Sequence, residues 1–125
     1  MKKTPEITES EWKIMRVLWR KSPLPAYDIT AELARTEDWH PNTIKTLLTR
    51  LHKKKVLGVT KYKNLFLYSP LVTEDQSIQA ESQSFLERLF GGSVRPLLVH
   101  FAEKEKLTKE DLAELQKILE RKEKK

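Results

Sequence analysis

The 125-residue sequence contains no cysteine, only three glycines and no long apolar run. The absence of cysteine excludes disulfides, thiolate metal sites and cysteine nucleophiles together. Because phosphate-binding loops depend on glycine, so few glycines argue against a nucleotide site. No apolar run approaches the roughly 18–20 residues that span a bilayer, and no apolar signal core follows the first residues. We therefore expect a cytoplasmic protein with no membrane insertion.

Convergent catalytic groups are also missing from the sequence. The three histidines are His40, His52 and His100, and no two of them share one helix face at metal-ligand spacing. No P-loop, dinucleotide-binding turn or serine nucleophile elbow is present. We therefore expect no enzyme, no metal site and no cofactor.

Charge is distributed unevenly along the chain, whose formal net charge is +6. Residues 1–70 carry 14 Lys and Arg against 7 Asp and Glu, whereas residues 71–125 carry 10 against 11. Hydrophobic residues make up 38% and charged residues 34% of the chain, which is enough apolar material for one or two small domains. The imbalance suggests contact with a polyanion in the first half and assembly in the second.

The segment from residue 39 to residue 55 predicts a helix with two unlike faces, and it contains no carboxylate. Its apolar stripe follows helical spacing: Ile44, Leu47, Leu48 and Leu51. Its other face carries amide, hydroxyl and cationic side chains: Asn42, Thr43, Lys45, Thr46, Thr49, Arg50 and Lys53. Such a face suits DNA bases and phosphates. The alternative is an ordinary surface helix that happens to be basic.

The residues before this helix predict two further short helices. Thr8 and Glu11 form a capping-box pattern, so a first helix should run from about 9 to 20, where Ser22-Pro23-Leu24-Pro25 ends it. A second helix is expected at about 26–36, and Pro41 suits the first turn of the third. Two short helices followed by a helix with a polar outer face indicate a helix-turn-helix.

The next segment changes to the alternating pattern of strands. Val59 to Tyr62 and Leu65 to Tyr68 flank Lys63-Asn64, and Pro70 follows, so we expect a β-hairpin that ends there. A hairpin in this position would be a wing whose Lys61 and Lys63 reach phosphates. Alternatively the hairpin only covers the core, a role expected in part for Tyr62, Phe66 and Tyr68.

Three amphipathic helices are expected in the second half, at about 74–90, 94–101 and from 109, with a break at Gly91-Gly92 and a solvated tail from Arg121. Their apolar residues have little else to bury against, so we expect a homodimer through them. The alternative is that they fold back on the first half. The expected dimerisation residues are Phe85, Leu86, Leu89, Phe90, Leu97, Leu98, Phe101, Leu112, Leu115 and Leu119.

The predicted fold class is therefore mainly α with a small β-hairpin. Residues 1–71 should form an N-terminal winged helix-turn-helix domain that binds DNA, and residues 72–125 a three-helix dimerisation domain. The competing function is a helical interaction adaptor with a basic surface and no specific DNA target.

Four segments resemble the penicillinase and methicillinase repressor family, which includes the copper-transport repressors (the BlaI/MecI/CopY group). They are residues 8–19 with their Glu-Trp pair, 42–51, 66–68 and 84–92. The resemblance implies a dimer that binds an inverted-repeat DNA operator and represses transcription. It implies that Thr43, Lys45 and Thr46 meet base edges while Arg50 and Lys53 hold phosphates.

The sequence departs from the family pattern at three points. Lys55 stands where many members have glycine, so either Lys55 adopts the left-handed conformation or the helix continues by a turn. His100-Phe101 stands where β-lactam-responsive members have the Asn-Phe bond cut through a membrane metalloprotease sensor pathway, and the histidine counts against cleavage. The cysteine cluster of the copper-responsive branch is absent, which excludes copper sensing by that route.

Overall fold

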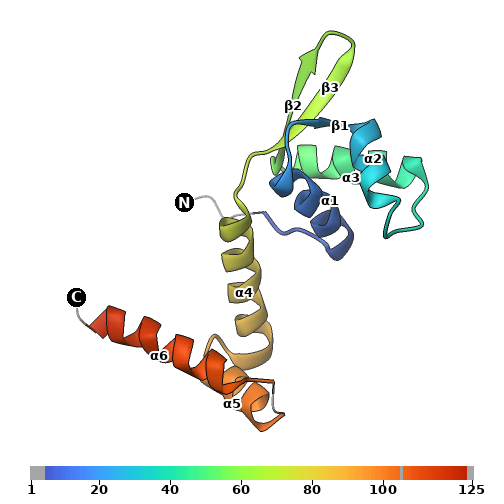
Figure 1. The fold of residues 1–125 in the computed structure, drawn as a ribbon. Coiled ribbons are helices and arrows are strands. Elements are labelled where there is room, and N and C mark those ends of the chain that lie inside the picture. Colours follow the sequence, from blue (N-terminus) through green and yellow to red (C-terminus); the bar gives the residue numbers. More distant parts are fainter. Residues whose placement is uncertain (1–4, 105, 124–125) are drawn as a thin grey trace. The chain divides into compact units, whose positions relative to one another are not determined.

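The computed structural model describes residues 5–104 and 106–123, and the chain divides into two compact units between Ser82 and Gln83. The first unit holds three helices, three strands and the start of a fourth helix, and the second holds the remaining helical segments (Figure 1). The mainly helical class with a small sheet is confirmed. The functional division at residues 71 and 72 stays a prediction.

Helix α1 (Glu9–Arg20) begins where the capping box predicts. The Glu11 N–H donates to Thr8 Oγ1 at 3.2 Å, and the Thr8 N–H donates to Glu11 Oε1 at 2.9 Å. Two N–H groups that the helix start leaves free are thereby satisfied. Ile14, Met15 and Leu18 are fully buried, so this side of α1 forms the centre of the core.

Two features between α1 and the third helix differ from the prediction. Helix α2 (Ala26–Leu33) ends three residues early, because the Arg35 and Thr36 N–H groups bond carbonyls three residues back in a tighter turn. Strand β1 (Leu24–Pro25) pairs with β3 where we expected only a helix stop. Two residues are too few to show the alternating pattern of a strand in the sequence. Proline is tolerated in β1 because this strand lies at the edge of the sheet.

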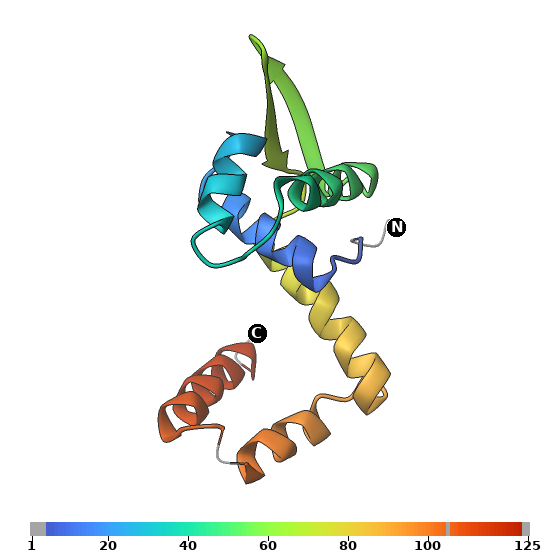
Figure 2. The same ribbon diagram turned by 90° about the vertical axis from the view of Figure 1, so that its right-hand side faces the viewer.

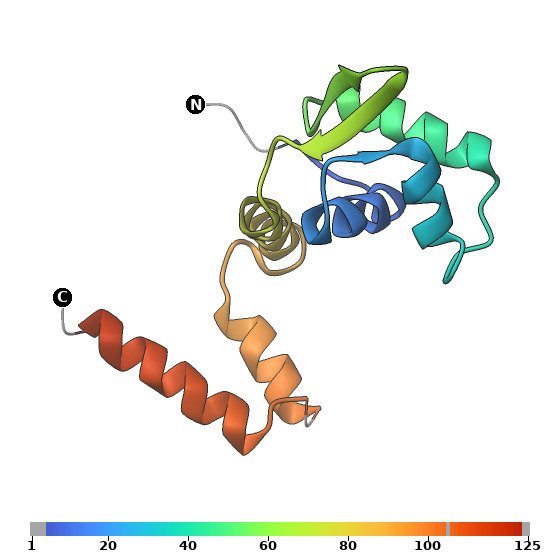
Figure 3. The ribbon, with the colours of Figure 1, turned by 45° about the horizontal axis from the view of Figure 1, so that its top comes forward.

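The predicted hairpin is confirmed as strands β2 (Leu57–Tyr62) and β3 (Leu65–Pro70), joined by a tight turn at Lys63-Asn64. Their antiparallel register runs from Leu57 opposite Pro70 to Tyr62 opposite Leu65. The strand order β1-β3-β2 can be followed in Figure 3. In Figure 2 the hairpin projects beyond α1, α2 and the third helix, α3 (Pro41–Lys53).

The core of the first unit lies where α1, α2 and α3 meet the base of the hairpin. Its buried residues include Ile29 of α2, Leu48 of α3, Leu57 at the start of β2 and Val56 just before it. The Trp19 indole N–H donates to the Val72 carbonyl at 3.0 Å, which holds the chain leaving β3 against α1. The first unit thus presents α3 and the hairpin on a single rigid base.

A partly buried ion pair joins α1 to the end of α3. Lys54 follows the last residue of α3, and its Nζ bonds Glu11 Oε1. Burial alone would raise the pKa of Glu11, but the hydrogen bond and charge of Lys54, with two hydrogen bonds to Thr8, outweigh it and hold that pKa below its ordinary value. The sequence suggested only the capping role of Glu11.

Helix α4 (Glu74–Phe90) crosses from the first unit to the second, which also contains α5 (Arg95–Glu103) and α6 (Lys109–Glu123). The predicted break between α4 and α5 is confirmed, since Gly91 (φ 62°) and Gly92 (φ 90°) adopt conformations that favour glycine. Helix α6 continues past Arg121, where we expected a tail, to Glu123; residues 124–125 lie outside the described residues. No helix among the described residues is both long and apolar enough to cross a membrane.

The Glu11→Gln variant tests whether the ionised carboxylate stabilises the fold. Gln preserves the cap but loses the charge, so the free energy of unfolding should fall by about 1–3 kcal/mol at pH 7. Because the folded-state pKa of Glu11 is lowered, its contribution is present above the ordinary value of about 4.3 and is lost as pH falls through the folded pKa. Urea unfolding between pH 7 and pH 3 should therefore show the two proteins converging in acid. A gap that stays constant with pH would contradict this.

Candidate nucleic-acid interface

The two faces of α3 separate as the sequence predicts. Ile44, Leu47, Leu48 and Leu51 are at most 5% exposed and pack into the core. Burial of this stripe leaves the opposite face in solvent. All seven predicted polar positions on α3 are exposed: Asn42, Thr43, Lys45, Thr46, Thr49, Arg50 and Lys53.

The cations of this outer face are not neutralised by the protein itself. In the part of the chain that the structure describes, the ion pairs are Lys13–Glu37, Arg35–Glu32 and Lys54–Glu11, and none involves Lys45, Arg50 or Lys53. An exposed helix face with unpaired cations and no carboxylate attracts polyanions, and it can release counterions when it meets phosphates.

Two threonine hydroxyls on this face have a defined orientation. Thr46 Oγ1 donates to the Asn42 carbonyl at 3.0 Å, and Thr49 Oγ1 donates to the Lys45 carbonyl at 2.9 Å. Each hydroxyl proton is therefore used within the helix, and the oxygen retains acceptor capacity beside its methyl group. In a major groove such a side chain can accept from the amino group of cytosine or adenine, or contact the thymine methyl.

The start of α3 is fixed by His40, which the sequence did not identify as a cap. The Asn42 N–H donates to His40 Nδ1 at 3.0 Å, and Pro41 occupies the first helical turn. Aspartate, asparagine, serine and threonine are the usual residues at this position. A His before a Pro was therefore a weak signal, although the proline itself correctly placed the helix start.

The end of α3 decides between the two conformations expected for Lys55. Lys55 has φ 65°, so the helix stops and the chain reverses. The Lys55 N–H bonds the His52 carbonyl and the Val56 N–H bonds the Leu51 carbonyl, both at 3.0 Å. This is the Schellman arrangement, in which glycine is the usual reversing residue. Lysine adopts the same conformation here against a steric cost of about 1 kcal/mol.

The hairpin carries its two predicted lysines at its tip. Lys61 Nζ lies 5.9 Å from the centre of the Phe66 ring, and Lys63 Nζ lies 5.5 Å from that of Tyr62. The prediction that Tyr62 and Phe66 help cover the core is wrong, because they are 59% and 55% exposed. They lie beyond the core along the projecting hairpin, whereas Tyr68, nearer its base, packs against the core.

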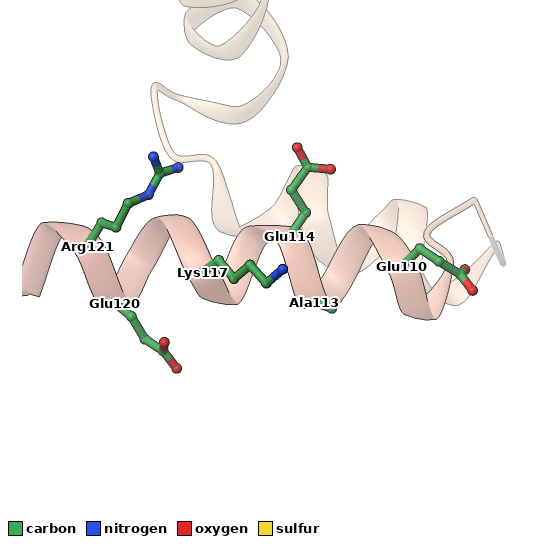
Figure 4. A pocket seen from close by; sticks show the side chains of 6 residues that line it. All are labelled: Glu110, Ala113, Glu114, Lys117, Glu120 and Arg121. Atoms are coloured by element: carbon green, nitrogen blue, oxygen red, sulfur yellow. The ribbon is translucent and has the colours of Figure 1, made fainter.

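The second unit has a shallow hollow along α6 that bears no convergent chemistry. It measures about 760 Å³, and its lining comes from that helix alone: Glu110, Ala113, Glu114, Lys117, Glu120 and Arg121. In Figure 4 the acidic and basic side chains point in different directions rather than toward one point. The hollow is therefore a solvated helix face.

Similar proteins match the chain over almost its whole length. The family described as penicillinase repressor matches residues 7–121. The penicillinase repressor of Bacillus licheniformis is 38% identical over 120 residues, which cover 96% of this chain and 94% of that protein. The methicillin resistance regulatory protein MecI of Staphylococcus aureus strain N315 is 37% identical over 120 residues, which cover 96% and 98%.

Two solved structures of the repressor BlaI resemble part of the chain. One is the DNA-binding domain of the repressor BlaI, and the other is monomeric Bacillus licheniformis BlaI in complex with the blaP half-operator. Each is 38% identical, has a TM-score of 0.54, and covers 61% of this chain and 93% of that chain.

The conformation of Lys55 predicts an unusual stabilising substitution. Lys55→Gly should raise the free energy of unfolding by up to about 1 kcal/mol, because it removes the clash of a side chain at positive φ, partly offset by the greater freedom of glycine in the unfolded chain. Lys55→Ala is the matched control, since it removes the same charge but keeps Cβ. Urea denaturation that finds the two variants equally stable would contradict the assigned strain.

Proposed function

Because the chain belongs to the penicillinase repressor family, whose members are DNA-binding transcriptional repressors and not enzymes, we propose that it acts as a homodimer on an inverted-repeat operator. Helix α3 would lie in the major groove of each half-site, and the β2–β3 hairpin would lie along the flanking backbone. This is the function that the resemblance of its motifs implies.

The observation that carries the proposal is the exposed, carboxylate-free face of α3. A helix inserted into a major groove needs polar side chains short enough to approach base edges, with cations near the phosphates. Thr43 and Thr46 provide the first, and Arg50 provides the second. The similarity to BlaI, whose monomeric form was solved in complex with the blaP half-operator, supports DNA as the ligand of this face.

The contacts should divide by position along α3 and by chemistry. Thr43, Lys45 and Thr46, in the first half of the helix, are proposed to read bases, with Asn42 and Thr49 beside them. Arg50 and Lys53, in the last turn, are proposed to hold phosphates. Lys61 and Lys63 would add phosphate contacts from the wing.

Dimerisation is supported by the second unit, whose described residues form no buried core. Among its described residues no hydrophobic side chain is buried, and Leu89, Leu112 and Leu119 are each more than half exposed. Apolar faces of this kind, on helices joined by short connections, require a partner to exclude water. A second copy of the chain is the proposed partner.

The resemblance implies cleavage within the second unit through a membrane metalloprotease sensor pathway, and His100-Phe101 is the proposed position in this chain. Phe101 is 38% exposed. The bond lies inside α5, where the Lys104 N–H bonds the His100 carbonyl, so α5 must unwind locally before a protease can bind it in extended form.

Thr46→Val tests base reading without changing charge. Loss of the hydroxyl should weaken binding to the selected operator by about 1–3 kcal/mol while leaving affinity for scrambled duplex unchanged. Lys61→Met is the contrasting variant. It should weaken binding to the operator and to scrambled duplex alike, and it should lower the slope of log affinity against log salt by about 1 for each lost phosphate contact. Fluorescence anisotropy over a salt series measures both. If the wild-type protein binds operator and scrambled DNA with equal affinity, the result would favour the helical interaction adaptor over the operator-specific repressor.

Leu89→Asp tests the dimer. Since Leu89 is 61% exposed in the single chain, the substitution should leave each chain folded but place a charge in the proposed interface. Sedimentation should show monomers, and operator affinity should fall because the two half-sites no longer bind as a unit. Glu87→Asp on the same helix is the conservative control. A variant that remains dimeric would show that the proposed interface is wrong.

A further inference from the structure

We infer that Glu11 and Lys54 are positioning residues for DNA recognition: their partly buried ion pair sets the angle at which α3 and the wing meet the duplex. The inference rests on the proposed function. It assigns a role to two residues that face away from the DNA-binding surface and would touch no base or phosphate themselves.

Lys54 differs from the lysines on either side of it. Lys53 and Lys55 are exposed, whereas Lys54 turns inward, bonds Glu11 and also donates from Nζ to the Glu6 carbonyl at 3.0 Å. Its side chain is 32% exposed and that of Glu11 is 1% exposed. The middle lysine of the run thus uses its ammonium group within the protein, whereas its two neighbours remain exposed to solvent.

The pair lies at the point where the orientations of α3 and the wing are both determined. Lys54 directly follows the last turn of α3, which carries Arg50, and Lys55 reverses the chain after it. Next, the Val56 carbonyl accepts from the Leu71 N–H at 2.8 Å, which closes the base of the hairpin. Anchoring Lys54 to α1 therefore fixes the end of the reading helix and the base of the wing against one rigid element.

The local chemistry favours positioning over stability as the reason for this pair. Among the described residues, Glu11 Oε2 is buried without a hydrogen-bond partner. A buried ion pair pays a desolvation penalty that a well-packed neutral pair avoids, so such pairs are often no more stabilising than apolar replacements. A directional bond between two fixed elements does, however, restrict their mutual angle, and recognition surfaces require that restriction.

The test is the charge-balanced double variant Glu11→Gln/Lys54→Met. Gln keeps the α1 cap, Met keeps the length of the lysine stem, and net charge is unchanged. Glu32→Gln/Arg35→Met is the matched control, because it removes an exposed ion pair by the same kind of substitutions and also leaves the net charge unchanged. Each protein is titrated with the inverted repeat that the wild type selects from a randomised duplex pool, and with scrambled duplex, over a salt series.

The expected result is a Tm within a few degrees of wild type, roughly tenfold weaker operator binding, and unchanged affinity for scrambled DNA and unchanged salt slope. If the double variant Glu11→Gln/Lys54→Met binds the operator as tightly as the wild type does, the inference is overturned. A large fall in the Tm of that variant would also overturn it, because the role of the ion pair would then be structural. A salt slope lowered by about 1 per subunit would show instead that Lys54 contacts phosphate. A wild-type protein that selects no repeat would overturn the proposed function itself, and this inference with it.

Discussion

Burial of one apolar stripe on α3 is the constraint on which the proposed DNA-binding surface depends. Ile44, Leu47, Leu48 and Leu51 can reach the core only if the opposite side of the helix faces solvent. Rotating α3 to hide its cations would expose four large aliphatic side chains, at a cost of about 1.5–3 kcal/mol for each. The same core that stabilises the first unit therefore holds the threonines and cations of α3 outward.

Features with a strong local signal were predictable from the sequence. The Thr8–Glu11 box and Pro41 located the starts of α1 and α3, since capping groups and a fixed proline φ act within one turn. Gly91-Gly92 located the break after α4 for the same reason. The apolar periodicity of α3 identified both its buried and its exposed face, and hence the candidate interface.

The features that escaped prediction depend on tertiary contact. Strand β1 exists only because β3 supplies its partner, and two residues cannot show an alternating pattern. Lys54 looked like any member of a basic run, because nothing local indicates that Glu11, 43 residues earlier, lies beside it. Tyr62 and Phe66 have the composition of core residues, yet the length of the hairpin carries them past the core into solvent.

Amide chemical-shift mapping of the labelled full chain, titrated with its selected operator duplex, tests most directly whether the outer face of α3 meets DNA while the second unit supplies the dimer contact. We expect large shifts through Asn42–Lys53 and at Lys61 and Lys63, and little change in α6. Shifts concentrated in α6, with residues 42–53 unaffected, would contradict it.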